Sequence, residues 1–446
     1  MAAVGVGAES AGDSYLPASG NGGYRTLGYD LDLKYRISTN RLTATAAISA
    51  VATQQLSRFS LDLVGLRASR VSIGGRRVDF RQTATKLRVT PVLPLIAGES
   101  FVVTVEYAGA PRPRRTRWGT LGWEELEDGL LVASQPSGAP TWFPCNDHPS
   151  DKASYRIRFE TEAAYRVVCN GRLTDFRVVA GRGQWTYVQP EPTATYLATV
   201  QIGRYAALDL GLAGTAGTAG TLYFPPAIER AVLADFADVP RMVSVFEQAF
   251  GPYPMESYSV VVTADVLEIP LEAQGLAVFG SNHADGRGGS ERLVAHELAH
   301  QWFGNSVGLA AWKDIWLNEG FACYAEWIWS EASGSVSADA LAHQYRVELS
   351  HLPTDLIVGD PGAAHMFDDR VYKRGALTLH ALRLVVGDAA FFGVLRAWTT
   401  LKRHGTASTA EFVALAEAQT GLALGALFTA WLYEPALPAL PAASAR

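Results

Sequence analysis

Cysteine is nearly absent from this sequence. The 446 residues include only Cys145, Cys169 and Cys323, an odd number without the spacing of a structural zinc site. We therefore expect reduced thiols and a reducing compartment, and we predict a cytoplasmic location. The first 14 residues have neither a basic segment nor an apolar core, so we expect no secretory leader.

Long apolar runs and basic clusters are also missing. No stretch approaches the roughly 20 apolar residues of a membrane-spanning helix. The net charge is −6, and lysine and arginine are scattered along the chain. Neither a membrane nor a nucleic acid is therefore an expected partner. The oligomeric state is open, and a monomer agrees with the composition.

The periodicity of the apolar residues changes partway along the chain. From Tyr29 to about Tyr205 apolar residues alternate with polar ones, as in Tyr29, Leu31, Leu33 and Tyr35. Gly74-Gly75 has the composition of a hairpin turn. This half is therefore predicted to be a strand-rich domain of antiparallel sheets.

Helical periodicity dominates from Ala227 onward. Two short extended segments are expected, at Tyr258–Thr263 and around Leu276–Gly280, and Ser337 and Ser408 are predicted to start later helices. The repetitive stretch Gly211–Gly220 is predicted to be a surface loop near a domain boundary. We expect an α+β protein with a β-rich domain over residues 1–207 and a mainly helical domain over 208–446.

One motif carries the chemistry of the second half. The segment His296-Glu297-Leu298-Ala299-His300 places two imidazoles one helical turn apart, so that both can bind the same ion. Glu319, nineteen residues after His300, can supply a third ligand and leave the fourth position to water. This pattern predicts a catalytic site with one Zn²⁺. Two solvated or core histidines would be the alternative, but the flanking residues favour the metal.

The flanking residues predict two facing helices. Ser290 is expected to cap the first helix, which Gly304-Asn305 would end. Asn318 is expected to cap the second, so that Glu319 lies in its first turn. Glu326, two turns later on the same face, is expected either to orient a ligand histidine or to be an ordinary rim carboxylate.

The zinc motif with its third glutamate resembles the gluzincin zinc aminopeptidases, the family of aminopeptidase N and leukotriene hydrolase. The resemblance spans nearly the whole chain. Matching segments occur in order, at residues 20–24, 142–149, 271–276, 296–319 and 372–376. It implies a saddle-shaped antiparallel β-domain followed by a thermolysin-like zinc peptidase domain. The chain is expected to be a short form without the C-terminal helical domain of larger relatives.

The same resemblance implies roles for further residues. Glu272 would hold the free amino group of the substrate, and Gln135 matches a glutamine of the family site. Gly275 and Leu276 are also expected to contact substrate, since the segment to Phe279 would offer an exposed strand edge to the peptide. Tyr372 would donate a hydrogen bond to the oxyanion of the tetrahedral intermediate.

The sequence departs from the family pattern at two places. Only Glu272 survives of the usual glycine-alanine-methionine-glutamate-asparagine segment, which reads Ile-Pro-Leu-Glu-Ala here. Ser137 replaces a glutamate that the family has shortly after Gln135. The substrate amine would thus meet one protein carboxylate rather than two. His148 receives no catalytic role and is expected to form a turn before Pro149.

These residues predict a zinc aminopeptidase that hydrolyses the N-terminal bond of peptides through a metal-bound water, with Glu297 as the general base. Peptides with a free N-terminus are the expected partners. Three alternatives remain: an endopeptidase without a free-amine requirement, an epoxide hydrolase, and a non-enzymatic scaffold. Trp142, Phe143, Trp302 and Phe303 could form apolar walls of the site, or equally pack in the cores.

Overall fold

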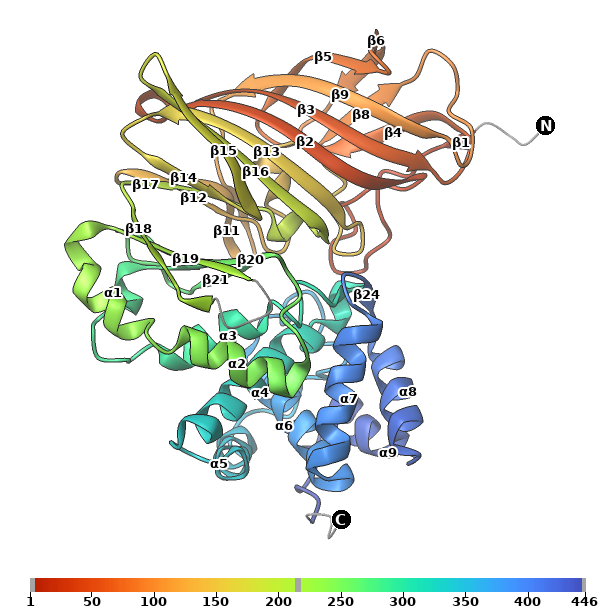
Figure 1. Cartoon of the computed structure of the whole chain (residues 1–446). Helices are drawn as coiled ribbons and strands as arrows, with labels where there is room; N and C mark the ends of the chain where they lie inside the picture. Colours follow the sequence, from red (N-terminus) through yellow and green to blue (C-terminus); the bar gives the residue numbers. More distant parts are fainter. Residues whose placement is uncertain (1–4, 213–217, 443–446) are drawn as a thin grey trace.

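The computed structural model describes residues 5–212 and 218–442. Three β-sheets built from the first half lie above the helices of the second half in Figure 1, and a further five-stranded sheet lies between them. The predicted order, a β-rich region followed by a mainly helical one, is confirmed.

The largest sheet of the first half has eight strands. Its order is β15 (Arg172–Val179), β16 (Arg182–Thr193), β13 (Ala153–Glu162), β2 (Tyr24–Arg36), β3 (Arg41–Ala52), β9 (Ser100–Gly109), β5 (Arg67–Ile73) and β6 (Arg76–Arg77). The predicted alternation is confirmed, since Leu31, Leu33 and Tyr35 all point into the core. Most neighbouring strands of this sheet are antiparallel, as predicted, and β2 and β13 depart from that pattern because they run parallel. These strands are far apart in sequence, so no hairpin turn sets their direction.

Two smaller sheets complete the first half. One contains β1 (Gly5–Val6), β4 (Leu56–Asp62), β8 (Lys86–Thr90) and β7 (Asp79–Gln82). The other contains β10 (Arg114–Thr116), β11 (Gly119–Leu126), β12 (Gly129–Ala133), β17 (Val200–Gly203) and β14 (Arg166–Cys169). The Gly74-Gly75 hairpin is confirmed between β5 and β6, where both glycines have positive φ.

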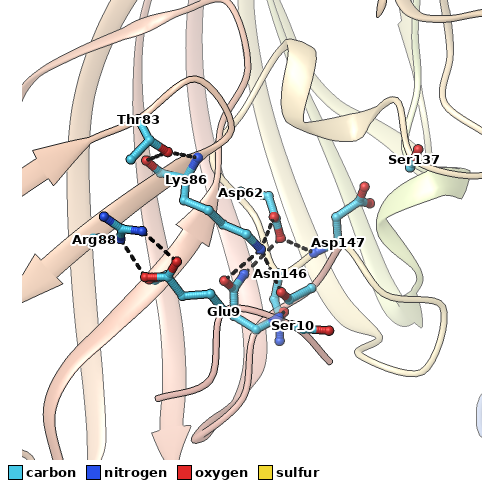
Figure 2. A network of polar contacts seen from close by, with 12 residues as sticks. Glu9, Ser10, Asp62, Thr83, Lys86, Arg88, Ser137, Asn146 and Asp147 are labelled. Atoms are coloured by element: carbon cyan, nitrogen blue, oxygen red, sulfur yellow. Dashed lines mark hydrogen bonds and ion pairs between the residues drawn. The ribbon is translucent and has the colours of Figure 1, made fainter. Parts of the chain in front are cut away.

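A buried ion pair between β8 and β4 also contacts the segment at 142–149, which lies between β12 and β13. Lys86 Nζ lies 2.6 Å from Asp62 Oδ1, and both side chains are less than a tenth exposed. The second oxygen of Asp62 accepts a hydrogen bond from the backbone N–H of Asp147 (Figure 2). Two residues along β8, Arg88 forms a more exposed pair with Glu9.

We expect Lys86→Met to destabilise the protein by about 3–5 kcal/mol, because it leaves the Asp62 carboxylate buried without a counter-charge. The matched change Arg88→Met breaks a pair whose side chains are about one third exposed, and should cost about 1 kcal/mol or less. Urea unfolding of the two variants measures the difference. Equal losses would show that the burial of the Lys86 pair has no energetic consequence.

The sheet of the second half has the order β18 (Ala206–Asp209), β19 (Ala219–Phe224), β20 (Ser257–Val262), β22 (Leu276–Phe279) and β21 (Leu271–Ala273). The two predicted extended segments are confirmed as β20 and β22. The predicted loop Gly211–Gly220 extends too far, because residues 219 and 220 begin β19; residues 213–217 lie outside the described part. The predicted boundary between 207 and 208 falls inside β18.

The helices follow this sheet. They are α1 (Glu229–Asp235), α2 (Val239–Phe250), α3 (Glu291–Ala299), α4 (Trp316–Ser333), α5 (Ala338–Ser350), α6 (Asp369–Val386), α7 (Asp388–Leu401), α8 (Thr409–Thr420) and α9 (Gly425–Phe428); two short strands, β23 (Gly308–Leu309) and β24 (Thr406–Ala407), pair beside them. The predicted caps Ser337 and Ser408 are confirmed. Across residues 5–212 and 218–442, the structure contains no helix with the length and apolar character needed to span a bilayer.

Two glycines let α4 and α6 cross in close contact. A β-carbon added at Gly320 would lie 2.9 Å from the Cα of Gly375, and one added at Gly375 would lie 2.8 Å from the Cα of Gly320. Neither position can therefore hold a side chain without separating the helices. Gly320 follows Glu319, and Gly375 lies one helical turn after Tyr372. The crossing thus brings these two functional candidates to the same place.

Candidate metal centre and active site

Helix α3 supplies the first part of the site. His296 lies in its last turn, and His300 lies one residue beyond its end, still in helical conformation, with its N–H donating to the His296 carbonyl at 3.2 Å. The predicted end at Gly304-Asn305 is too late, because tight turns begin at His300 and the N–H of Asn305 bonds the His300 carbonyl. Ser290 precedes the helix, but its side chain makes no capping bond.

Helix α4 supplies the facing carboxylates. It continues directly from a 3₁₀ turn and begins at Trp316, so Asn318 lies inside the helix and is not its cap, contrary to the prediction. The Asn318 amide instead donates to the Tyr196 hydroxyl at 3.4 Å. Glu319 lies in the first turn, as predicted.

The two histidines and Glu319 converge. Their ligand atoms all lie within 4.8 Å of one another, and all three residues are buried. His296 Nε2 lies 3.6 Å and His300 Nε2 3.4 Å from the same oxygen of Glu319. Two imidazoles and one carboxylate form a donor set that catalytic zinc sites use.

The other ring nitrogens have partners that orient the imidazoles. His296 Nδ1 lies 2.7 Å from Glu326 Oε1, and His300 Nδ1 lies 3.0 Å from the Phe303 carbonyl. Both partners accept hydrogen bonds, so they favour the tautomer with the proton on Nδ1. The Nε2 lone pairs then face the shared position between the three ligands.

Negative charge in the site also fits a dication. Burial lowers the pKa of His296, but hydrogen bonds to Glu319 and Glu326 raise it to about 10, so the surrounding carboxylates strongly favour a cation there. Glu297 is 5% exposed, and its Oε2 atom is buried without a hydrogen-bond partner in the part of the chain that the structure describes. An unsatisfied buried oxygen is costly unless something else binds there. The residues therefore fit one Zn²⁺ with Glu297 beside it.

Glu272 lies on the edge strand β21, which ends the sheet beside the histidines. Desolvation raises the pKa of Glu272 to about 7. The charge of His300 lowers this pKa, whereas the charges of Glu319 and Glu297 raise it further. A cation beside Glu272 would favour its ionised form. Gln135 donates from the first half of the chain to Glu272 Oε1 at 2.5 Å, so these two predicted site residues are brought together.

Gly275 and Leu276 do not lie on an exposed strand edge. The predicted exposed edge at Leu276–Phe279 is wrong, because β22 pairs with β20 on one side and β21 on the other. Leu276 is fully buried, and the N–H and carbonyl of Gly275 bond Gln301 and Ser259. The short hairpin strand β21, which carries Glu272, takes the edge instead.

The contacts of Ser137 and His148 are structural. Ser137 is 1% exposed, and its carbonyl accepts a hydrogen bond from Arg114 at 3.3 Å. It offers no carboxylate to replace the missing glutamate. His148 bonds Ser150 within a turn and lies 3.8 Å from Asp13, which agrees with a structural role.

Tyr372 lies in the first turn of α6, against the metal ligands. Its ring stacks on that of His296, with centroids 6.0 Å apart and planes 20° apart. Burial, together with the charges of Glu319, Glu272 and Glu297, raises the pKa of Tyr372 well above its usual value. Its hydroxyl therefore keeps its proton at neutral pH and can donate a hydrogen bond into the site.

Sequence reasoning missed two residues that hold the edge strand. Gln301 Nε2 and Asn305 Nδ2 both donate to the Ala273 carbonyl, at 3.1 Å each. The one sequence signal for this role was the position of Gln301, which directly follows the second histidine of the motif. Trp302 and Phe303 are 1% exposed within the core, and Trp142 and Phe143 are fully buried, so core packing rather than a substrate wall explains these aromatics.

Comparison with known proteins agrees with this architecture. Residues 25–197 match the model of the peptidase M1 N-terminal domain, and residues 235–431 match that of the peptidase family M1 domain. Human endoplasmic reticulum aminopeptidase 1 is 27% identical over 81% of this chain, and a probable aminopeptidase 2 of Sulfurisphaera tokodaii is 24% identical over 85%. The chain spans 42% and 50% of their lengths, respectively.

A solved structure matches over its full length. The M1 zinc metallopeptidase of Deinococcus radiodurans, in a variant bound to a Tyr-Ser-Ala substrate, is 33% identical with a TM-score of 0.89. The alignment covers 97% of this chain and 99% of that one. Yeast LTA4 hydrolase shares the fold at 19% identity, with a TM-score of 0.80 and coverage of 94% and 69%. By its sequence and its architecture, this chain belongs to peptidase family M1.

Proposed function

We propose that this chain is a zinc-dependent aminopeptidase that removes the N-terminal residue of peptides. One observation carries the proposal: the Glu272 carboxylate lies on the edge strand β21, close enough to His300 and Glu319 for their charges to affect its pKa. A carboxylate there can pair with a substrate ammonium, while the adjacent peptide bond reaches the metal site. The aminopeptidase names of the curated relatives support this reading.

The proposed roles follow from the geometry. Zinc, held by His296, His300 and Glu319, would supply Lewis-acid chemistry that activates water and polarises the scissile carbonyl. The free Oε2 of Glu297 would accept the proton of the attacking water and pass it to the leaving amine. Tyr372 would donate its hydroxyl proton in a hydrogen bond to the developing oxyanion.

Amine recognition would use a pair rather than a single residue. Gln135 bonds one oxygen of Glu272 and so limits how the carboxylate can rotate. The other oxygen would then pair with the substrate ammonium. Gly275 and Leu276 have no part in this scheme, since Gly275 bonds Gln301 and Ser259, and Leu276 is paired on both sides within the sheet.

We further propose a division into residues 1–207 and 208–446, with the boundary inside β18, and a reducing compartment such as the cytoplasm. The latter is supported by Cys145, Cys169 and Cys323, which are all buried and free of disulfide bonds. Peptides with a free N-terminus are the proposed substrates. The Tyr-Ser-Ala ligand of the Deinococcus protein is a suitable first test peptide.

A panel of peptides, each with a free or an acetylated N-terminus, tests the proposal. We expect cleavage of the free peptides only, because acetylation removes the charge that Glu272 would bind. A chelator should abolish cleavage, and added Zn²⁺ should restore it. Mass spectrometry of the products gives both the rate and the position of cleavage.

The Glu272→Ala variant completes this experiment. It should lower kcat/KM for free peptides and leave the zinc content unchanged, because Glu272 binds substrate and not metal. Equal cleavage of free and acetylated peptides would replace the aminopeptidase by an endopeptidase. No cleavage of any peptide by a zinc-loaded preparation would favour the scaffold.

A further inference from the structure

The ion pair behind His296 reaches from the surface to the metal site. The Glu326 side chain is 2% exposed, whereas that of its partner Arg292 is 53% exposed. A surface cavity of about 180 Å³ adjoins the pair and is lined in part by Glu291, Trp329 and Tyr345. A solvent-exposed residue therefore contacts a group that touches a metal ligand.

The contacts of Glu326 fix its orientation. One nitrogen of Arg292, Nη1, donates to both carboxylate oxygens, at 3.0 and 2.9 Å. Oε1 also faces His296 Nδ1 at 2.7 Å. The carboxylate is therefore held from two directions, and rotation of its plane would break the contact with Arg292 as well as that with the imidazole.

Helix α3 places Arg292 and His296 so that both contact Glu326. Arg292 and His296 are four residues apart and lie on one face of the helix, so both can reach the same side chain of α4. Without Arg292, Glu326 would be a buried carboxylate with His296 as its one hydrogen-bond partner among the described contacts. A carboxylate held less firmly restrains the ring of His296 less firmly.

We propose that Arg292 is a positioning residue for the metal: it holds Glu326 so that Glu326 orients His296 toward Zn²⁺. This inference rests on the zinc site of the proposed function. It assigns no contact with metal or substrate to Arg292. Its effect should therefore be seen in zinc affinity, before any catalytic step.

The test is zinc affinity, measured by competition between the chelator-stripped protein and a fluorescent chelator. Removing an outer partner of a metal ligand typically weakens metal binding ~10–100-fold. Glu326 is that direct partner and Arg292 lies one contact further out, so we expect Arg292→Met to raise the Kd for Zn²⁺ by about tenfold, the lower end of that range, with circular dichroism like that of the wild type. An unchanged Kd in a folded variant would overturn the proposal.

Two further variants separate positioning from a general charge effect. Arg241→Met removes a surface arginine that also contacts α4, through Trp329 and the Ala332 carbonyl, and it should leave the Kd unchanged. In a Glu326→Gln background, Arg292→Met should add little further loss, because its route to His296 is already altered. Equal effects of the two arginines, or full additivity with Glu326→Gln, would contradict the proposal. If wild-type protein itself binds no Zn²⁺, the proposed function fails rather than this inference alone.

Discussion

Glu297→Gln should keep its zinc and lose about 10²–10⁴-fold in kcat, the usual contribution of a general acid–base group. The buried Oε2 of Glu297 has no hydrogen-bond partner among residues 5–212 and 218–442, so it is free to take a proton from water. Glutamine has nearly the same shape but cannot accept that proton. The zinc ligands are untouched, and metal content should stay at one ion per chain.

Steady-state kinetics on a free peptide, with zinc content measured on the same sample, checks this prediction. Glu291→Gln is the matched control, since Glu291 lies on the same helix and accepts a hydrogen bond from Trp329. It should retain near wild-type turnover. A Glu297→Gln enzyme within tenfold of wild type would remove Glu297 from the role of base.

Tyr372→Phe should lower kcat by about 10²–10³-fold, as expected when one donor to an oxyanion is lost. The phenol keeps its proton because burial raises the pKa of Tyr372, so it is a hydrogen-bond donor throughout the neutral range. Phenylalanine preserves the stacking on His296. KM and zinc content should therefore change little compared with kcat.

The matched control is Tyr345→Phe, which makes the same chemical change on α5, where the ring stacks on Trp327 rather than on a metal ligand. Its kcat should be close to that of the wild type. If Tyr372→Phe raised KM and left kcat unchanged, Tyr372 would bind substrate in the ground state and would not stabilise the oxyanion.

The metal ligands could be predicted from sequence because local periodicity decides them. His296 and His300 are one helical turn apart, so whichever way α3 packs, both imidazoles point in the same direction. The prediction of Glu319 as a ligand required one further assumption, that a second helix faces the first. The convergence of the three ligand atoms agrees with that prediction.

The errors occur where tertiary contacts override local signals. Gly304-Asn305 has a helix-stop composition, yet α3 ends earlier, because the turns after His300 are fixed by contacts with β21 and by the carbonyl partner of His300. Asn318 has the side chain of a cap, but the preceding 3₁₀ turn continues into α4 and makes a cap unnecessary.

Long-range pairing was the least accessible feature. The parallel contact of β2 with β13 joins strands more than a hundred residues apart, and alternation alone gives no direction. The edge strand β21 has only three residues, too few to give a periodic signal. Arg292 carries no motif, and its contact with Glu326 follows only from how α3 packs on α4.

The bonds from Gln301 and Asn305 to the Ala273 carbonyl have a consequence for the product pattern. Ala273 is next to Glu272, and Gln301 is next to His300, so these bonds connect the proposed amine-binding carboxylate to the proposed metal ligands. If Glu272 binds the substrate ammonium as proposed, the distance from the ammonium to the metal site would be fixed, and we expect cleavage after the first residue. Digestion of a long peptide should thus produce a ladder of fragments, each one amino acid shorter than the last, without release of dipeptides.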